Sequence, residues 1–343
     1  MRARRPLLLA PALGLTMLVA ACGSPGSSSA GDGSSSSAPS GSSMSSTASG
    51  TVCEGVAGDK LVVLTDDQHL QQVDNIVPAV NATVAGDNPD IIGVLDSVST
   101  VLDTPTLIGL NKSVDVDRKT SSEVAQGFVS SKGLDQQKSV GKGTTVVVGA
   151  PNFSEGATLA AIYADTLKAA GFDASTQTIG NRETYLPLLE NGDLSVVPEY
   201  VGTLATFINN KVNGDKAEPV ASGDLNKTMS ALTDLGAQVG LVFGTPAAAQ
   251  DQNAFAVTQA FADKYGVSSL SDVASTCGGG VTLGGPPECP QRDFCEVGLK
   301  KVYDMTITDF TSLDAGGPLT KAALKQGKIA LGLVFSSDGS LAG

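Results

Sequence analysis

The chain holds few of the side chains that perform nucleophilic or metal chemistry. His69 is its only histidine and lies in the polar stretch LTDDQHLQQ. A Ser-His-Asp hydrolase would have to use this residue, yet the sequence has no G-x-S-x-G nucleophile motif. It also has no G-x-x-x-x-G-K-[ST] loop, which excludes nucleotide hydrolysis by that route. We therefore expect no enzymatic activity and no cofactor, and we interpret His69 as a surface residue.

The N-terminal segment has the features of an export signal. Residues 1–21 combine three arginines with an apolar stretch and with small residues just before Cys22. The motif VAAC at their end resembles the lipobox of bacterial lipoproteins, in which the cysteine carries lipid. Residues 22–52 are mostly Ser, Gly, Ala, Thr and Pro and cannot bury enough apolar surface to fold. We expect a signal peptide over 1–21, a tether over 22–52, and an extracytoplasmic protein anchored to the cell membrane through Cys22.

Four further cysteines lie beyond the tether. The spacings among Cys277, Cys289 and Cys295 are twelve and six residues, which fit no common zinc finger, and no histidine is near them. We therefore predict no metal site. In an oxidising compartment these cysteines are expected to form two disulfides, and three pairings are open. A short loop closes at little entropic cost, so we predict a bond between Cys289 and Cys295, which leaves Cys53 for Cys277.

Length and charge bound the class of protein. The residues that follow the tether suffice for two domains, each with its own core. The formal net charge is −13, and the sequence has no long basic run. This composition argues against nucleic acid as a partner.

Two distant segments share one pattern. LLENGDLSVVPEYVGT (188–203) and ALKQGKIALGLVFSSDG (323–339) each predict a helix that ends at a glycine, Gly192 or Gly327, followed by a short strand. The strands end on an aromatic residue, Tyr200 or Phe335, with polar residues beyond. Ligands of α/β folds collect at the carboxyl ends of strands, so we expect both copies to face one cleft. A generic α/β connection would show the same pattern, which alone therefore does not specify a site.

A third segment, TTVVVGAPNFSEGATLAAIYADTLKAAGFDA, adds a loop between a strand and a helix. It predicts a strand from Thr145 to Val148 and a helix from about Gly156 to Ala170. We expect Ser154 to cap the helix, whose free N–H groups can bind an anionic group of a ligand.

Several blocks in one order resemble the osmoprotectant-binding proteins of ABC importers, which are receptors for glycine betaine, choline and carnitine. These blocks are VVVGAPNFSE, YLPLLENGDLSVVPEYVGT, AQDQNAFAVTQAFADKYGVSSLSDVA and SLDAGGPLTKAALKQGKIALGLVFSSDG. The resemblance covers the chain from about residue 53 to its end. It implies an α/β, two-lobed class II periplasmic-binding-protein fold with the ligand between the lobes. It also implies an ABC permease and its ATPase as partners.

The order of the blocks departs from that family. A block like KLVVLTDDQHLQQVDNIVPAVN…LIGLNKSVDVDRKTSSEVAQGFVSSKGL ends the chain there, whereas here it precedes the strand that normally begins the domain. The chain thus resembles a circular permutant. This order predicts lobe 1 over 53–245, lobe 2 over 246–334 and a return crossover to lobe 1 over 335–343. Lobe 1 would comprise the family's C-terminal block (53–134), a linker across the old termini (135–143) and the family's N-terminal block (144–245).

The permuted order makes two further structural predictions. The strand KLVVL should pair within lobe 1, and Gly343 should lie near residues 53–60. The alternative is an unrelated N-terminal domain followed by a truncated receptor, which would leave lobe 1 without its closing strand and helices.

The nature of the ligand follows partly from the aromatic residues. A quaternary ammonium group cannot donate a hydrogen bond, so selective receptors surround it with aromatic faces. The chain has no tryptophan and five tyrosines. By the family pattern, Phe255 and Phe335 stand where cage residues are often tyrosine, with Tyr185 and Tyr200 nearby. This thin cage leaves open a second interpretation, a sensor or receptor for a non-quaternary polar or phenolic ligand that uses the same fold.

We expect Tyr200 and Asp338 to approach the ligand from opposite walls of the cleft. The full set of expected ligand-binding residues is Asn152, Phe153, Ser154, Tyr185, Tyr200, Thr203, Gln252, Asn253, Phe255, Phe335, Ser337 and Asp338.

Overall fold

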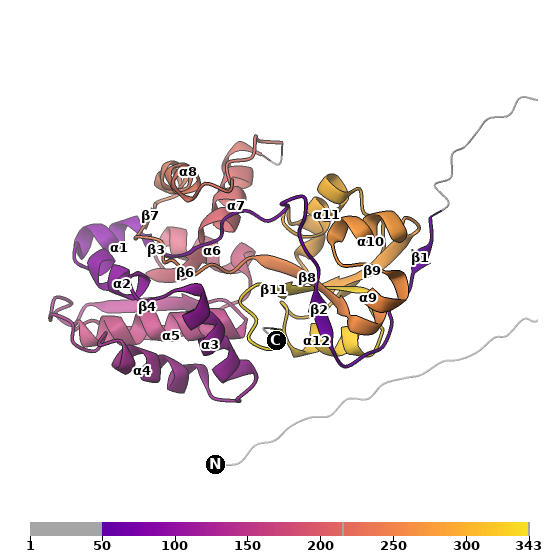
Figure 1. Cartoon of the computed structure of the whole chain (residues 1–343). Helices are drawn as coiled ribbons and strands as arrows, with labels where there is room; N and C mark the ends of the chain where they lie inside the picture. The colour runs from indigo at the N-terminus through magenta and orange to yellow at the C-terminus, as the bar shows by residue number, and fades with distance from the viewer. Residues whose placement is uncertain (1–49, 215, 342–343) are drawn as a thin grey trace, which may run out of the picture. The chain divides into compact units, whose positions relative to one another are not determined.

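Figure 1 shows the computed structural model of the chain, which describes residues 50–214 and 216–341. The expected signal peptide, Cys22 and nearly all of the expected tether lie outside these residues. Within the part that is described, no single helix is long and apolar enough to cross a membrane. The bent pair Ile91–Ser99 and Thr104–Asp115 passes that test by length and composition only.

The first lobe is built on a five-stranded sheet of order β5-β4-β6-β3-β7. Strand β4 is parallel to β5 and β6, whereas β3 runs antiparallel to both β6 and β7. The strands are β3 (Ile76–Asn81), β4 (Thr145–Ala150), β5 (Asp173–Thr178), β6 (Val196–Tyr200) and β7 (Leu241–Phe243). The helices are α1 (Ala82–Asp87), α2 (Ile91–Ser99), α3 (Thr104–Asp115), α4 (Ser121–Ser131), α5 (Ser154–Ala169), α6 (Arg182–Asn191), α7 (Val201–Asn213) and α8 (Leu225–Gln238).

The side chains of β3 explain how helices cover both faces of this sheet. Successive residues of a strand point to opposite faces. Ile76 and Val80 join the core that contains the buried residues of α2 to α5, whereas Val77 and Ala79 join the core with those of α6 to α8. All four are fully buried. The strand is therefore buried on both faces, as its nearly continuous apolar sequence indicates.

The second lobe contains a six-stranded sheet of order β1-β9-β11-β8-β2, with β10 also paired to β9. Its strands are β1 (Val52–Cys53), β2 (Leu61–Val63), β8 (Asn253–Thr258), β9 (Gly280–Gly285), β10 (Ile307–Ser312) and β11 (Leu331–Phe335). Its helices are α9 (Gln259–Tyr265), α10 (Leu270–Thr276), the short 3-10 helix η1 (Cys289–Gln291), α11 (Glu296–Tyr303) and α12 (Pro318–Lys325).

The two sheets share one strand order. The path β10-β9-β11-β8-β2 repeats β5-β4-β6-β3-β7, with the two antiparallel pairings at the same places. The repeated sequence pattern lies at equivalent positions of this arrangement, as α6 and β6 in one lobe and as α12 and β11 in the other. Gly192 and Gly327 follow the helices with φ of 89° and 67°, the left-handed conformation expected of helix-terminating glycines.

The predicted lobe boundary is wrong at the start of the chain. Strand β2 pairs antiparallel with β8, and β1 pairs with β9, so residues 52–63 belong to the second lobe rather than to lobe 1. A strand of three residues carries no local feature that specifies its sheet, and its partner here lies almost 200 positions away. The chain then passes between the lobes in two crossover segments, residues 64–75 and 244–252. The segment after β11, residues 336–341, contacts the first lobe through Ser337, but Leu341 packs in the second lobe, so the expected return crossover to lobe 1 is wrong for the described residues.

Both predicted disulfides are confirmed. Cys53 is bonded to Cys277 and Cys289 to Cys295, with Cα–Cα distances of 5.3 and 5.2 Å. The first bond fixes β1 beside α10 of the second lobe. The second closes a loop of the same lobe that reaches the cavity described below.

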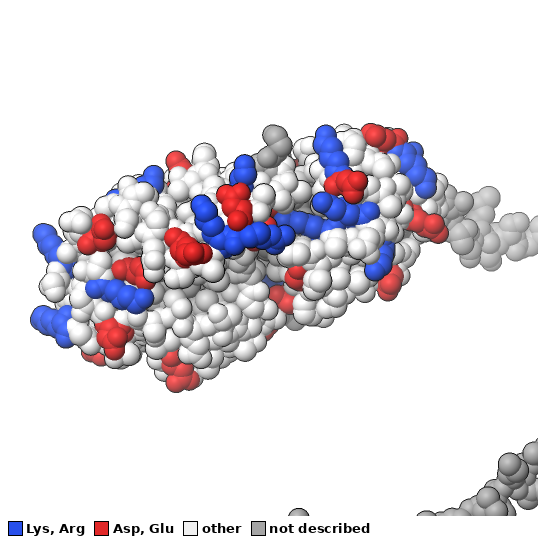
Figure 2. All heavy atoms as spheres, turned by 90° about the horizontal axis from the view of Figure 1, so that it is seen from below, with Lys and Arg blue, Asp and Glu red and all other residues white. Residues whose placement is uncertain are grey.

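Figure 2 shows one face of the molecule, on which Lys and Arg side chains are interspersed with Asp and Glu. The face in view therefore carries no extended patch of a single sign. This face differs from the continuous basic surface that is typical of nucleic-acid-binding proteins.

Candidate ligand-binding site

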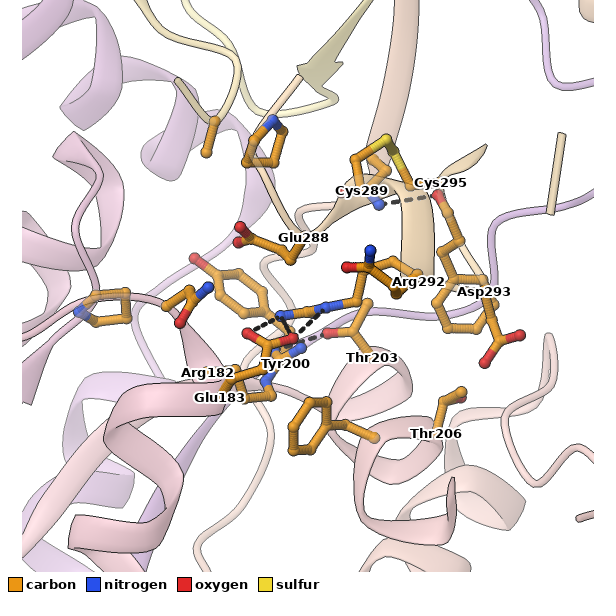
Figure 3. Close-up of a pocket in the computed structure, with 18 of the residues that line it drawn as sticks. Arg182, Glu183, Tyr200, Thr203, Thr206, Glu288, Cys289, Arg292, Asp293 and Cys295 are labelled. Atoms are coloured by element: carbon orange, nitrogen blue, oxygen red, sulfur yellow. Dashed lines mark hydrogen bonds and ion pairs between the residues drawn. A yellow bond between two sulfur atoms is a disulfide. The ribbon is translucent and has the colours of Figure 1, made fainter. Parts of the chain in front are cut away.

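A cavity of about 490 Å³ is lined by residues of both lobes (Figure 3). The first lobe contributes the loop after β4, the start of α6, the end of β6 and one side of α7. The second lobe contributes the loop after β9, the segment from η1 to the start of α11, and the end of β11. The carboxyl ends of β4, β6 and β11 thus meet at the cavity, the edge where α/β folds bind ligands.

Three aromatic rings form one wall. Phe153 follows β4, Tyr200 ends β6 and Phe335 ends β11 of the other lobe. The ring centroid of Phe153 lies 6.4 Å from that of Tyr200 and 5.6 Å from that of Phe335, and both pairs are tilted by 32°. The Tyr200 hydroxyl donates a 2.6 Å hydrogen bond to Oε1 of Glu155, which fixes the orientation of its ring.

A buried ion pair fixes the floor on the first-lobe side. Arg182, at the start of α6, donates from Nε and Nη2 to both carboxylate oxygens of Glu199 at 2.9 and 2.7 Å. Tyr185 donates to the same carboxylate at 2.8 Å, and Arg182 also donates to Thr203. Burial would lower the pKa of Arg182, but Glu199 holds it well above its ordinary value. Since Glu199 neutralises this charge, the pair is a rigid element rather than a free anion-binding group.

Two other buried acids face the cavity. Asp74 accepts hydrogen bonds from the backbone N–H groups of Gly202 and Thr203 at the start of α7, and burial raises its pKa to about 7. Asp251 lies in the second crossover, where burial and then the neighbouring Glu155 raise its pKa well above the ordinary value. Among the described residues, no basic side chain forms an ion pair with either acid. A cation bound beside these acids would favour their ionised forms.

Side chains of the disulfide-closed loop reach across to the first lobe. Arg292 donates from Nε and Nη2 to the two oxygens of Glu183, both at 2.9 Å, and lies over the ring of Phe207 at 5.4 Å. Asp293 accepts a 2.7 Å hydrogen bond from Asn210. Burial would raise the pKa of Glu183, but Arg292 lowers it below the ordinary value. These contacts join the lobes at the cavity (Figure 3).

The structure brings seven of the twelve expected site residues to the cavity, and five lie elsewhere. Those that line it are Asn152, Phe153, Tyr185, Tyr200, Thr203, Asn253 and Phe335. Those outside its lining are Ser154, Gln252, Phe255, Ser337 and Asp338.

Each of these five has a structural role. The Phe255 ring is buried in the core of the second lobe, and Gln252 donates to the backbone oxygen of Gln72. Ser154 does not cap α5 as expected, because Phe153 occupies the N-cap position and Ser154 is the first helical residue.

Asp338 does not face Tyr200 across the cavity. Its carboxylate pairs with Lys321 and accepts hydrogen bonds from the backbone and hydroxyl of Ser340, as expected for an Asp-Gly turn. Ser337 instead bonds to buried groups of the first lobe. The expectation of opposite cleft walls is therefore wrong for Asp338, whereas Phe335, three residues earlier, does reach the cavity.

Sequence reasoning missed the charged residues of the site. The charged residues of the lining are Asp74, Arg182, Glu183, Lys211, Asp251, Glu288, Arg292 and Asp293. A linear pattern does not reveal which distant parts of the chain meet at the cavity. Only Asp251 had a usable signal, since it directly precedes two expected residues. Among the described residues, no three His, Cys, Asp or Glu side chains gather as a metal site.

The profile of one protein family matches most of the chain. It describes the substrate-binding domain of the ABC-type glycine betaine transport system (OpuAC), and it matches residues 56–131 and 144–343. The chain belongs to this family. Substrate-binding domains of ABC importers are extracytoplasmic transport receptors rather than enzymes, and they have a two-lobed fold.

The remaining comparisons add little. The comparison with curated proteins returned no match. Among solved structures, the unliganded open form of the periplasmic murein tripeptide-binding protein MppA is similar over 55% of this chain, with 11% identity and a TM-score of 0.27. The match spans 44% of that protein's length. A likeness at this level carries no argument about the function of this chain.

Proposed function

We propose that the chain binds a small organic cation of the quaternary amine or betaine class and delivers it to an ABC permease. The observation that carries this proposal is the convergence of Phe153, Tyr200 and Phe335 from both lobes beside the buried acids Asp74 and Asp251. Aromatic faces attract a cation that cannot hydrogen-bond, by about 0.5 to 2 kcal/mol each. A buried carboxylate adds an attraction that a neutral ligand does not receive.

The ends of the cavity suit the rest of such a molecule. Asn152, Asn181 and Asn253 line it together with Thr203, and these groups can bond a hydroxyl or a carboxylate. Asn253 donates to the backbone oxygen of Phe294 at 2.9 Å, and its carbonyl oxygen can accept a hydrogen bond from a ligand donor.

An uncharged phenolic or polar ligand is the second candidate. This candidate is supported by the aromatic wall, in which only Tyr200 carries a hydroxyl group. Phe153 and Phe335 offer π-faces but no hydrogen bonds. A flat aromatic molecule would stack on these rings and bond to the asparagine side chains.

A thermal-shift experiment separates the two candidates. Ligand binding to the native state raises the melting temperature in a concentration-dependent way. We expect choline, glycine betaine or carnitine to raise it, and we expect a much smaller effect from the neutral tert-butyl analogue of choline, which has the same shape. Equal shifts from choline and its neutral analogue would refute a cation site. Stabilisation by phenols alone would establish the second candidate.

A single-ring variant tests whether the observed wall is the binding wall. Phe335→Ala removes one face and should weaken choline binding by about 2- to 30-fold. Val302→Ala removes a half-exposed apolar side chain of the same lobe, remote from the cavity lining, and is the matched control. Equal affinity of Phe335→Ala and the parent would place the ligand elsewhere.

We also propose that the receptor is held at the membrane by a lipid on Cys22. The support is the lipobox-like motif VAAC with a Ser- and Gly-rich segment behind it. Cys22→Ala should release the protein from the membrane fraction. Retention of that variant at the parent's level would exclude lipid anchoring at this residue.

A further inference from the structure

The two crossover segments and the segment after β11 are bonded to one another beside the cavity. Asp251, in the second crossover, donates from its backbone N–H to the carbonyl of Asp74 in the first, at 3.1 Å. Ser336, in the segment after β11, donates to the carbonyl of Gln252 in the second crossover, at 2.9 Å. Asp251 therefore lies where both connections between the lobes meet the segment after β11.

Ser337, in the segment after β11, joins two carboxyl groups. Its hydroxyl donates to Oε2 of Glu155 at 2.6 Å, while its backbone N–H donates to Oδ1 of Asp251 at 3.0 Å. One serine residue thus bridges the two carboxyl groups. Glu155 and Asp251 are 3% and 4% exposed, so water does not screen their charges.

The surrounding groups stabilise one negative charge on this pair, but they offer no cation that would stabilise a second negative charge. Tyr200 and Asn111 donate to Glu155 at 2.6 and 2.5 Å. Among the described residues, no Lys or Arg forms an ion pair with Glu155 or Asp251. Two ionised carboxylates bridged by a single serine repel each other strongly at low dielectric, so such a pair retains one proton at a pH where single carboxyl groups are ionised.

The titratable groups around the pair do not change this conclusion. Burial raises the pKa of Glu155 and of Tyr200, and burial followed by the charge of Glu155 raises that of Asp251. Asp74 adds a further acid on the cavity side. The charged or titratable groups beyond these are Arg182, Glu199 and Tyr185, which bond to one another, and Asp338, which pairs with Lys321.

We propose that Glu155 and Asp251 share a proton and that capture of a cation beside Asp251 expels this proton to solvent. The proposal rests on the proposed function in one respect, that the ligand is a cation. Asp251 lines the cavity, whereas Glu155 does not. Glu155 is therefore a positioning residue, which acts on the ligand through the charge of Asp251 and through the Tyr200 ring.

Proton release makes the affinity depend on pH. Below the apparent pKa of the pair, the cation must displace a proton, so the affinity rises with pH by at most about tenfold per pH unit for one proton. Above that pKa both groups are already ionised and the affinity becomes constant. Glu155→Gln removes the repulsion on Asp251, so the rise should move to lower pH and the profile near neutral pH should flatten.

The first arm of the experiment needs no ligand. Infrared spectra of the full chain should show the carbonyl band of a protonated carboxyl group at about pH 6, where ordinary Asp and Glu side chains are ionised. Asp74, whose pKa is raised to about 7, contributes a band of its own, so the test is the part of the intensity that the pair adds. That part should be lost in Glu155→Gln and in Asp251→Asn, and the full band should persist in Asp309→Asn, which removes an exposed carboxyl group of β10. Equal band intensity in the parent and in both pair variants would overturn the shared proton, whatever the ligand is.

The second arm counts protons during binding. Calorimetric titrations with choline, in two buffers of different ionisation enthalpy, should show release of up to one proton by the parent and by Asp309→Asn near pH 6. Glu155→Gln should release clearly fewer protons than the parent, and the remainder comes from Asp74. Tyr200→Phe keeps the ring but removes a hydrogen bond to ionised Glu155, so its proton release should persist to higher pH.

The outcomes separate the two proposals. Choline binding without proton release by the parent would overturn the coupling while leaving the receptor function intact. A chain that shows the infrared band but binds none of the cations would overturn the proposed function and the coupling with it. Unfolding of Glu155→Gln would leave Asp251→Asn and Tyr200→Phe as independent tests.

Discussion

The contact between Arg292 and Glu183 should contribute to ligand affinity by stabilising the joined arrangement of the lobes. Arg292 belongs to the second lobe and Glu183 to the first, so their bidentate pair exists only when the two surfaces meet. The ligand cavity is lined by both surfaces. Arg292→Ala should therefore weaken binding without a large loss of stability in the ligand-free protein.

The magnitude follows from the exposure of the pair. The side chains of Arg292 and Glu183 are 25% and 41% exposed, so solvent screens the pair and it contributes at most about 1 kcal/mol. The Arg292 guanidinium over Phe207 adds about 0.5 to 1 kcal/mol. The sum, about 0.5 to 2 kcal/mol, corresponds to a loss of about 2- to 30-fold in affinity.

A double-mutant cycle measured by calorimetry with choline tests this reasoning. Arg292→Ala, Glu183→Gln and the double variant should show a coupling of a few tenths to about 1 kcal/mol. Lys168→Ala is the matched control, because its ion pair with Asp165 lies within α5 of a single lobe. If the effects of the two substitutions were simply additive, or if Lys168→Ala weakened binding as much as Arg292→Ala, the contact would not act through the joining of the lobes.

Three further outcomes are expected. Replacing Cys289 and Cys295 by serine should weaken choline binding several-fold, because the loop that carries Arg292 loses its restraint. The effect on the melting temperature of the ligand-free protein should be smaller, and unchanged affinity would contradict this prediction. Arg182→Met should destabilise the protein by about 3 to 5 kcal/mol in denaturant unfolding, because it leaves buried Glu199 unpaired, and Glu199→Gln in the same chain should recover part of that loss. Burial raises the pKa of Asp74 from 3.8 to about 7, so the folded state binds this proton more tightly than the unfolded state does. The free energy of unfolding should therefore fall as the pH rises from about 4 to about 7. Asp74→Asn should flatten this fall, and an equal slope in both proteins would contradict the prediction.

Local chemistry explains which parts of the structure could be predicted from the sequence. A glycine that ends a helix acts through its own left-handed conformation and needs no distant partner. Gly192 and Gly327 therefore indicate the two helix-strand units from the sequence alone. The bond between Cys289 and Cys295 closes six positions of chain and was equally accessible. The contact between Glu155 and Ser337 joins residues 182 positions apart, and no period or motif of the sequence specifies it.

The same distinction explains the incorrect predictions. Phe255 and Phe335 both follow the family pattern of aromatic positions, yet only Phe335 lies at the end of its strand, beside the cavity. Phe255 is the third residue of β8 and packs into a core. Asp338 is three residues beyond Phe335, where the chain has already turned toward Lys321. The aromatic residue type predicts a candidate ligand contact, but the position of the residue along its strand determines whether its ring reaches the cavity or the core.

The permuted chain order stays a prediction. The two segments that the family profile matches are separated by residues 132–143, which include the expected linker. At the other expected junction Gly343 lies outside the described residues, and Leu341 packs against the same cluster of the second lobe as Leu61.

A change of chain order at these junctions would leave the cavity intact for a geometric reason. Val140 and Gly141 of the linker bond to Ala170, at the C-terminal end of α5, whereas Glu155 lies in its first turn. A helix of this length separates the two ends by about 20 Å. The segments that bring Asp74 and Asp251 to the cavity are crossovers, which remain unbroken whichever loop holds the termini. Chain order in this fold can therefore change at the periphery while the charges and rings that face the ligand stay in place.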